Sequence, residues 1–148
     1  ETVTVQVEQV LAFLAGQDIA KQSKAGFWSL TDDTQLRTKV RLMGECVDET
    51  LQRFAIITSL MCRLAPVGKG ELEEKVVAIA KRLSVISNIN APEFIDKKAQ
   101  GTLINAMKEH GYINVDEQGR LVESTGLAEL KSIVTNLVDI EVLQSIAR

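Results

Sequence analysis

The stretch KVRLMGECVDETLQRFAIITSLMCRL (Lys39–Leu64) decides the fold of this chain. Its apolar residues recur in steps of three and four, which is the spacing of one face of a helix. They are Val40, Met43, Val47, Leu51, Phe54, Met61 and Leu64, with Thr58 on the same face. The pattern predicts one long amphipathic helix, which Pro66 and Gly68 then stop.

Similar spacing predicts helices on both sides of this stretch. The expected ranges are Val3 to about Lys24, Glu71 to about Ser87, Asn90 to His110, and Leu127 to Ala147 with a break near Asp139. Apolar stripes interrupted by polar residues are typical of helices that cover a shared core. The chain is therefore predicted to be mainly α-helical.

The helix before His110 carries clear start and stop signals. Asn90 is expected to be its N-cap, Pro92 needs no amide partner in the first turn, and Glu93 would complete a capping box. At the other end, Gly111 is free to take the left-handed conformation that follows many helices. These signals predict a helix that begins near Asn90 and ends at His110.

A β-hairpin is predicted directly after this helix. Tyr112–Val115 and Arg120–Val122 flank the turn Asp116–Gly119, which ends in glycine. Two helices followed by a hairpin give the outline of a winged helix.

A similarity between two segments of the chain suggests that this outline occurs twice. Gly26–Leu30 matches Gly111–Val115 at an offset of 85 residues. We interpret this as two winged-helix-like units, residues 1–66 and 67–148, of which the first is truncated at its N-terminus. The simpler alternative is that any helix ending in glycine before a strand produces this pattern. The predicted fold class is thus mainly α with small β-hairpins, with one or two winged-helix-like units.

Composition narrows the class of protein. The 148 residues are 45% hydrophobic and 25% charged, with a net charge of −3. These values are ordinary for a globular chain and give no electrostatic reason to expect binding to nucleic acid or anionic lipid. No apolar run reaches the roughly 20 residues of a membrane span, and no secretory signal is recognisable. Because the chain begins at Glu1 and not at methionine, we expect it to be a segment of a longer protein.

Two cysteines are expected to be reduced. Cys46 and Cys62 lie on one predicted helix, where their separation of roughly 24 Å is beyond the reach of a disulfide. Apolar neighbours indicate that both are core residues of a cytosolic protein.

Residues with catalytic or metal-binding potential are scarce. The single histidine, His110, ends a predicted helix, where a cationic side chain interacts favourably with the helix dipole. The acidic pairs Asp32-Asp33 and Asp116-Glu117 are typical of turns, and Gly68-Lys69-Gly70 lacks the frame of a phosphate loop. We therefore predict no catalytic residue, no metal site and no bound cofactor within this chain.

DNA binding is the main alternative function that a winged helix suggests. The recognition helix would be Pro92–His110, whose charges nearly cancel, and the wing offers Arg120 among several acids. A DNA-binding surface normally carries clustered Lys and Arg. The sequence therefore favours a winged helix that does not contact DNA.

The dipeptide Phe27-Trp28 has two interpretations. It is either a docking surface for another domain or the membrane interface, or a strand segment packed on the helices. The match of this segment to Tyr112-Ile113 favours the packed strand, more firmly for Phe27 than for Trp28.

Five segments in order resemble the C-terminal region of the bacterial membrane-associated glycerol-3-phosphate acyltransferase. They are DETLQRFAII (Asp48–Ile57), GELEEK (Gly70–Lys75), AKRLSV (Ala80–Val85), INAPEFIDK (Ile89–Lys97) and HGYI (His110–Ile113). The resemblance is clearest between Glu45 and Gly119. One departure is Ile95, where the family typically has a second phenylalanine after Phe94.

The resemblance implies the following function. The parent enzyme transfers an acyl chain from acyl-CoA or acyl carrier protein to glycerol 3-phosphate, the first step of phospholipid synthesis. The family uses a histidine followed five positions later by an aspartate. Here Val115 stands five positions after His110, and Asp116 is one place too far. No catalytic residue of the family can therefore be assigned in this chain, and whether it is itself an enzyme stays open.

The role expected from this resemblance is that of a non-catalytic accessory domain. Its expected partner is the catalytic domain of the same polypeptide, with self-association or contact with the membrane surface as further possibilities. The resemblance implies a soluble segment of an enzyme located at the cytoplasmic face of the bacterial inner membrane. A winged-helix adaptor or transcriptional regulator is the alternative. An exposed apolar strip on helix 39–64 or 127–147 would mark the surface that the missing partner covers.

Overall fold

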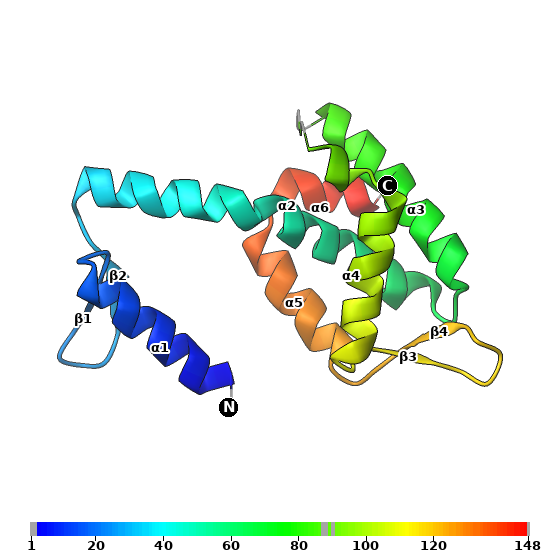
Figure 1. Ribbon diagram of the computed structural model, residues 1–148, viewed down its shortest axis with the longest axis horizontal. Coiled ribbons are helices and arrows are strands. Elements are labelled where there is room, and N and C mark those ends of the chain that lie inside the picture. Colours follow the sequence, from blue (N-terminus) through cyan, green and yellow to red (C-terminus); the bar gives the residue numbers. More distant parts are fainter. Residues whose placement is uncertain (1–2, 87–88, 90, 148) are drawn as a thin grey trace. The chain divides into compact units, whose positions relative to one another are not determined.

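The computed structural model describes residues 3–86, 89 and 91–147, and the chain within it is mainly helical with two small β-hairpins (Figure 1). The predicted fold class is confirmed in this respect. The described residues form two compact units, 1–47 and 48–148, and the boundary between them falls within the long helix α2 (Thr34–Leu64). The predicted division into repeated units at residue 66 stays a prediction.

The first unit consists of a helix, a hairpin and the start of α2. Helix α1 (Val3–Gly16) is followed by the antiparallel strands β1 (Ala20–Gln22) and β2 (Trp28–Leu30). Asp33 then caps α2, because its side-chain Oδ1 accepts a hydrogen bond from the Leu36 amide at 2.9 Å. The cap places the start of this helix before the predicted Lys39.

The prediction of a helix as far as Lys24 is wrong. Helix α1 ends at Gly16, and Asp18 has a positive φ of 58°, which turns the chain out of the helix. The next residues pair with 28–30, so Ala20 lies opposite Leu30. Pairing between strands thus replaced the helical pattern that the apolar spacing suggested.

The second unit surrounds the second half of α2. It contains α3 (Lys69–Ile86), the short 3₁₀ helix η1 (Pro92–Phe94) and α4 (Lys97–Glu109), and then β3 (Ile113–Val115), β4 (Leu121–Glu123), α5 (Leu127–Leu137) and α6 (Ile140–Ala147). Figure 1 shows α3, α4, α5 and α6 arranged around α2. The predicted break near Asp139 is confirmed, because Val138 is extended between α5 and α6.

The predicted single helix from Asn90 to His110 is divided. Asn90 lies outside the described residues, and Pro92–Phe94 form only the 3₁₀ turn, which has no side-chain cap. Helix α4 begins later because the Asp96 carboxylate accepts the Lys98 amide at 2.9 Å and acts as its N-cap. The predicted capping box joins Glu93 to Asn90 and so falls outside the described residues.

The end of α4 and the hairpin after it agree with the predictions. Gly111, which precedes β3, and Gly119, which lies in the turn between β3 and β4, both have a φ of 77°. The two strands pair antiparallel, as predicted. A further bridge joins Val67, which lies between α2 and α3, to Leu121 of β4. The element order of this unit is compatible with the winged-helix outline.

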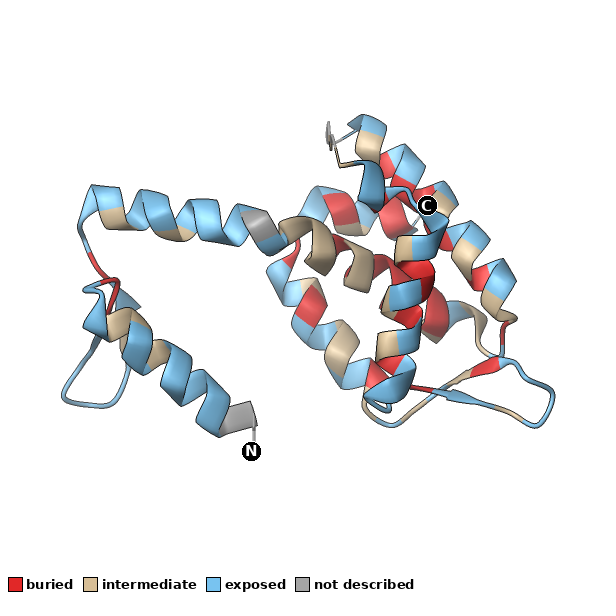
Figure 2. Ribbon diagram, viewed as in Figure 1, coloured by how far each residue is buried: buried red, intermediate tan, exposed pale blue. Residues whose placement is uncertain are grey.

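One continuous core occupies the second unit (Figure 2). Its largest fully buried side chains come from α2, α3, η1, α4, both strands and α5; they are Phe94, Ile56, Ile57, Leu60, Met61, Leu72, Leu83, Ile104, Met107, Ile113, Leu121 and Leu127. In the first unit, by contrast, the buried residues among those described are Ile19, Ala20 and Thr31. Residues 48–148 thus hold most of the burial that stabilises the chain.

Candidate functional site

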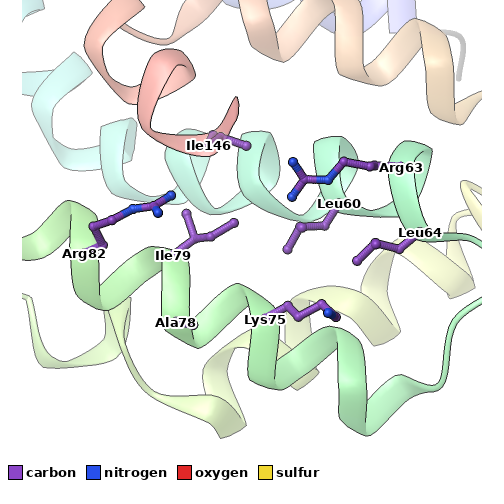
Figure 3. Close-up of a pocket in the computed structure, with 8 residues that line it drawn as sticks. All are labelled: Leu60, Arg63, Leu64, Lys75, Ala78, Ile79, Arg82 and Ile146. Carbon is purple, nitrogen blue, oxygen red and sulfur yellow. The ribbon is translucent and has the colours of Figure 1, made fainter. Parts of the chain in front are cut away.

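The main pocket of interest lies between α2, α3 and α6 (Figure 3). Its cavity is about 210 Å³. The lining residues are Leu60, Arg63 and Leu64 of α2, Lys75, Ala78, Ile79 and Arg82 of α3, and Ile146 of α6. Aliphatic side chains thus make the floor, and three cationic side chains stand around it.

The two arginines have different surroundings. In Figure 3 the guanidinium groups of Arg63 and Arg82 extend toward each other from opposite sides of Ile79 and Leu60. One nitrogen of Arg82 donates to the Ser145 backbone carbonyl, which fixes the orientation of this side chain. The remaining donors of Arg82, anchored in this way, are suited to hold an anion with little loss of side-chain entropy.

Lys75 completes the basic rim of the pocket. Its Nζ lies 3.6 Å from Glu71 on the same helix, an exposed pair that contributes little stability. The described residues that line the pocket include no carboxylate. A small apolar cavity with a cationic rim suits an anionic group attached to an aliphatic chain. The described lining residues place no nucleophile beside a base.

The sequence interpretation missed this pocket, although one signal was present. Lys75, Ile79 and Arg82 recur at helical spacing and therefore share a face of α3. The contribution of α2 and α6 depends on tertiary packing, so spacing along one helix was insufficient to find the site.

His110 lies at the C-cap of α4, as predicted. Its backbone amide donates to Ala106, and its side chain is exposed. Asp116, the nearest acid of the predicted turn, is held within the hairpin: its Oδ1 accepts the amides of Gln118 and Arg120 at 2.9 and 2.8 Å. The hydrogen bond from the Arg120 amide, foremost, lowers the pKa of this carboxyl below its ordinary value. Asp116 is thus engaged in turn structure and not in a pair with histidine.

The other acidic pair also serves turn structure. Asp33 caps α2, and Asp32 lies 3.3 Å from Arg37 in an exposed ion pair. Within the described parts of the chain, no three His, Cys, Asp or Glu side chains come together as metal ligands would. The segment Gly68-Lys69-Gly70 leads into α3, where Lys69 donates to Asn105 of α4 at 2.8 Å.

Cys62 is a free, half-buried thiol that packs against the core. Burial, followed by the nearby Glu123 carboxylate, raises the pKa of this thiol above its ordinary value. The side chain of Cys46 lies outside the described part, so its predicted core position stays a prediction.

Phe27 was predicted, more firmly than Trp28, to pack on the helices, and this prediction is wrong. Phe27 is 75% exposed in the hairpin turn, whereas Trp28 begins β2 and is half-buried. The reason is that residue 27 precedes the strand, so its side chain is outside the paired segment.

Two exposed apolar strips lie on the helices where partner surfaces were expected. One is on α2 and contains Leu42, Met43 and Val47. The other, which we call the α5–α6 strip, contains Ile133 and Leu137, one turn apart on α5, and Ile140, the first residue of α6. Exposed apolar groups close together on a surface commonly mark an interaction site.

The described residues thus form a helical module with a basic pocket and with exposed apolar side chains on α2, α5 and α6. The described helices include none that is long and apolar enough to cross a membrane. Residues 1–116 match the family described as the glycerol-3-phosphate acyltransferase C-terminal region, and the chain belongs to that family.

Individual relatives agree with this assignment. The chain is 63% identical to a glycerol-3-phosphate acyltransferase of Colwellia psychrerythraea over 99% of its own length, and 31% identical to one of Glaesserella parasuis over 99%. It is 34% identical to one of Pseudoalteromonas atlantica over 70% of its length. The chain spans only 18%, 17% and 13% of these relatives, respectively. No solved structure matches the chain.

Proposed function

We propose that this chain is a non-catalytic accessory domain of a glycerol-3-phosphate 1-O-acyltransferase. The parent protein would transfer an acyl chain from acyl-CoA or acyl carrier protein to glycerol 3-phosphate. Membership in the C-terminal family and the small share of each relative that the chain spans support this proposal. The winged-helix regulator alternative has no comparable support, because the relatives named above are acyltransferases.

The α5–α6 strip is the observation that carries the accessory role. Ile133, Leu137 and Ile140 are 51%, 58% and 68% exposed, although they lie on the helices that close the main core. Covering such residues removes apolar surface from water, which favours association by roughly 25 cal/mol for each Å² buried. The proposed occupant is the catalytic part of the same polypeptide.

Replacing Leu137 with glutamate in the full-length polypeptide tests this role. The neighbouring Asn136 is also exposed on α5 and is outside the strip, so Asn136→Glu is the matched control. We expect Leu137→Glu to reduce acyl transfer at unchanged folding of residues 48–148, and Asn136→Glu to leave acyl transfer intact. Equal activity of the two variants would contradict packing through this strip. If the unsubstituted polypeptide failed to transfer acyl chains to glycerol 3-phosphate, the family activity itself would be excluded.

The basic pocket favours a second role, contact with anionic lipid. Arg63, Lys75 and Arg82 surround an aliphatic floor, which complements a phosphate head group and the start of its chain. Sedimentation of the 148-residue chain with vesicles tests this role. We expect more bound protein on vesicles with 30% phosphatidylglycerol than on neutral ones, and loss of the difference in Arg63→Gln/Arg82→Gln. Equal binding of both vesicle types would exclude the role.

A further inference from the structure

A helix–hairpin–helix motif occurs twice in this chain, at an offset of 93 residues. The ends of α1 and α4 are Gly16 and Glu109, the hairpins begin at Ala20 and Ile113, and the next helices begin at Thr34 and Leu127. Each pair of positions is 93 residues apart. The sequence offset of 85 is therefore wrong: Gly26 corresponds to Gly119, the turn glycine, and not to Gly111.

Backbone hydrogen bonds repeat at the same offset. The amide of Ile19 donates to Leu14, and that of Tyr112 donates to Met107, both at 2.9 Å. In the turns, the Phe27 amide donates to Ser23 Oγ and the Arg120 amide to Asp116 Oδ1. Because both the elements and their local bonds agree, the two motifs are equivalent structures and not a chance similarity of helix ends.

In the second motif, the inner face of α4 is covered. Ile104 and Met107 are fully buried in the main core, and α4 contacts α3. Leu103, next to them, packs against the edge of the same core. Helix α3 contacts α4 directly, and side chains from the second half of α2 belong to the same buried cluster; both precede α4 in the chain.

Among the described residues of the first unit, the equivalent face of α1 is less covered. Leu11 and Leu14, which correspond to Ile104 and Met107, are only half-buried. Val10, which corresponds to Leu103, is 57% exposed. Val10 also lines an apolar groove of about 260 Å³ together with Gln6, Val7 and Leu11.

We propose that this α1 face binds a pair of helices from the longer polypeptide, equivalent to the second half of α2 and to α3. By analogy with α4, this pair directly precedes α1 in the chain. The Colwellia psychrerythraea relative has about four fifths of its length outside the matched region, which is ample for two helices. The complete first unit would then repeat the packing of the second, with Leu11 and Leu14 as core residues.

The charges on α1 define the chemistry of the occupant. In the second motif, a Cβ on Gly101 would lie 2.7 Å from Glu73 Oε1, so an acid of α3 directly faces Gly101. Glu8 takes the place of Gly101 in α1. An acidic side chain there would be repelled, so the occupying helix presents a lysine or arginine opposite Glu8. Its apolar face covers Val7 and Val10.

Val10→Asp tests the proposal, with Gln9→Asp as the matched control. Gln9 is exposed and corresponds to Thr102, which is exposed on the outer face of α4. Each substitution is made in the 148-residue chain and in the full-length polypeptide, and hydrogen exchange of the α1 amides is measured. We expect α1 amides to exchange at least tenfold more slowly in the full-length polypeptide, and Val10→Asp, but not Gln9→Asp, to abolish this difference.

Other occupants give different results. If α1 exchange is equally slow in the 148-residue chain, residues within this chain provide the cover, and the proposal is overturned. If slow exchange in the 148-residue chain depends on its concentration, a second copy is the occupant, which also overturns it. The readout does not need acyl transfer, so the proposal stands or fails independently of the proposed enzyme activity.

Discussion

Asp18 and Gly111 occupy equivalent positions between a helix and a hairpin, with positive φ values of 58° and 77°. Glycine adopts this conformation without strain, whereas a side chain with a Cβ costs roughly 1 kcal/mol there, somewhat less for aspartate. The first motif therefore carries a strained aspartate, Asp18, at the position where the second carries Gly111, which adopts this conformation without strain.

Asp18→Gly is expected to stabilise the first unit, and Gly111→Ala to destabilise the second by about 1 kcal/mol. Trp28, in β2, is the single tryptophan of the chain, so its fluorescence reports denaturation of the first unit. Far-UV circular dichroism reports mainly the helices of the second. Gly70→Ala in α3 is the control, since nothing lies within 4 Å of its added Cβ, and it should raise stability. A Gly111→Ala variant as stable as Gly70→Ala would contradict the prediction.

Gln100→Leu is expected to destabilise the second unit by about 1 kcal/mol. The fully buried Gln100 donates from Nε2 to the Phe94 carbonyl at 2.7 Å, which fixes η1 against α4. Leucine has a similar size but leaves this carbonyl without its donor. Urea denaturation followed by circular dichroism gives the free energy of unfolding. The exposed Lys98→Leu on the same helix serves as control, and an equal effect of both substitutions would exclude a role for the hydrogen bond.

The hairpin of the second unit is expected to lose stability in acid. Because the folded-state pKa of Asp116 is lowered, its stabilising effect is present above the ordinary aspartate pKa and is lost as pH falls through the folded-state value. Asp116→Asn should lower stability at pH 7 and weaken its decline toward pH 3. Denaturant midpoints across this range measure the effect. Glu117→Gln, an exposed neighbour, is the control; the same flattening in that variant would argue against Asp116.

Cys62 is expected to react slowly with thiol reagents at neutral pH. Burial raises its pKa, so the reactive thiolate is scarce in the folded chain. In a Cys46→Ser background, the rate with a disulfide reagent should increase when pH rises and when urea unfolds the chain. A rate at pH 7 equal to that of the unfolded chain would contradict the burial of this thiol.

Local sequence signals placed most elements of this chain correctly. The apolar spacing in Lys39–Leu64 predicted α2, Gly111 predicted the end of α4, and Gly119 predicted the turn of the second hairpin, because these features act within a few residues. The break near Asp139 and the C-cap position of His110 were predicted in the same way. The segment resemblance also indicated the family to which the chain belongs.

Tertiary structure decided what local signals left ambiguous. Residues 20–22 have a helical pattern but pair with 28–30, and α4 begins later than predicted, with Asp96 as its N-cap. The basic pocket required α2, α3 and α6 to meet, and the repeat at 93 residues became visible only from hydrogen-bonded elements. The physical reason is the range of the interactions: helix periodicity and turn conformation are set by neighbours in sequence, whereas strand pairing and burial depend on residues that folding brings together.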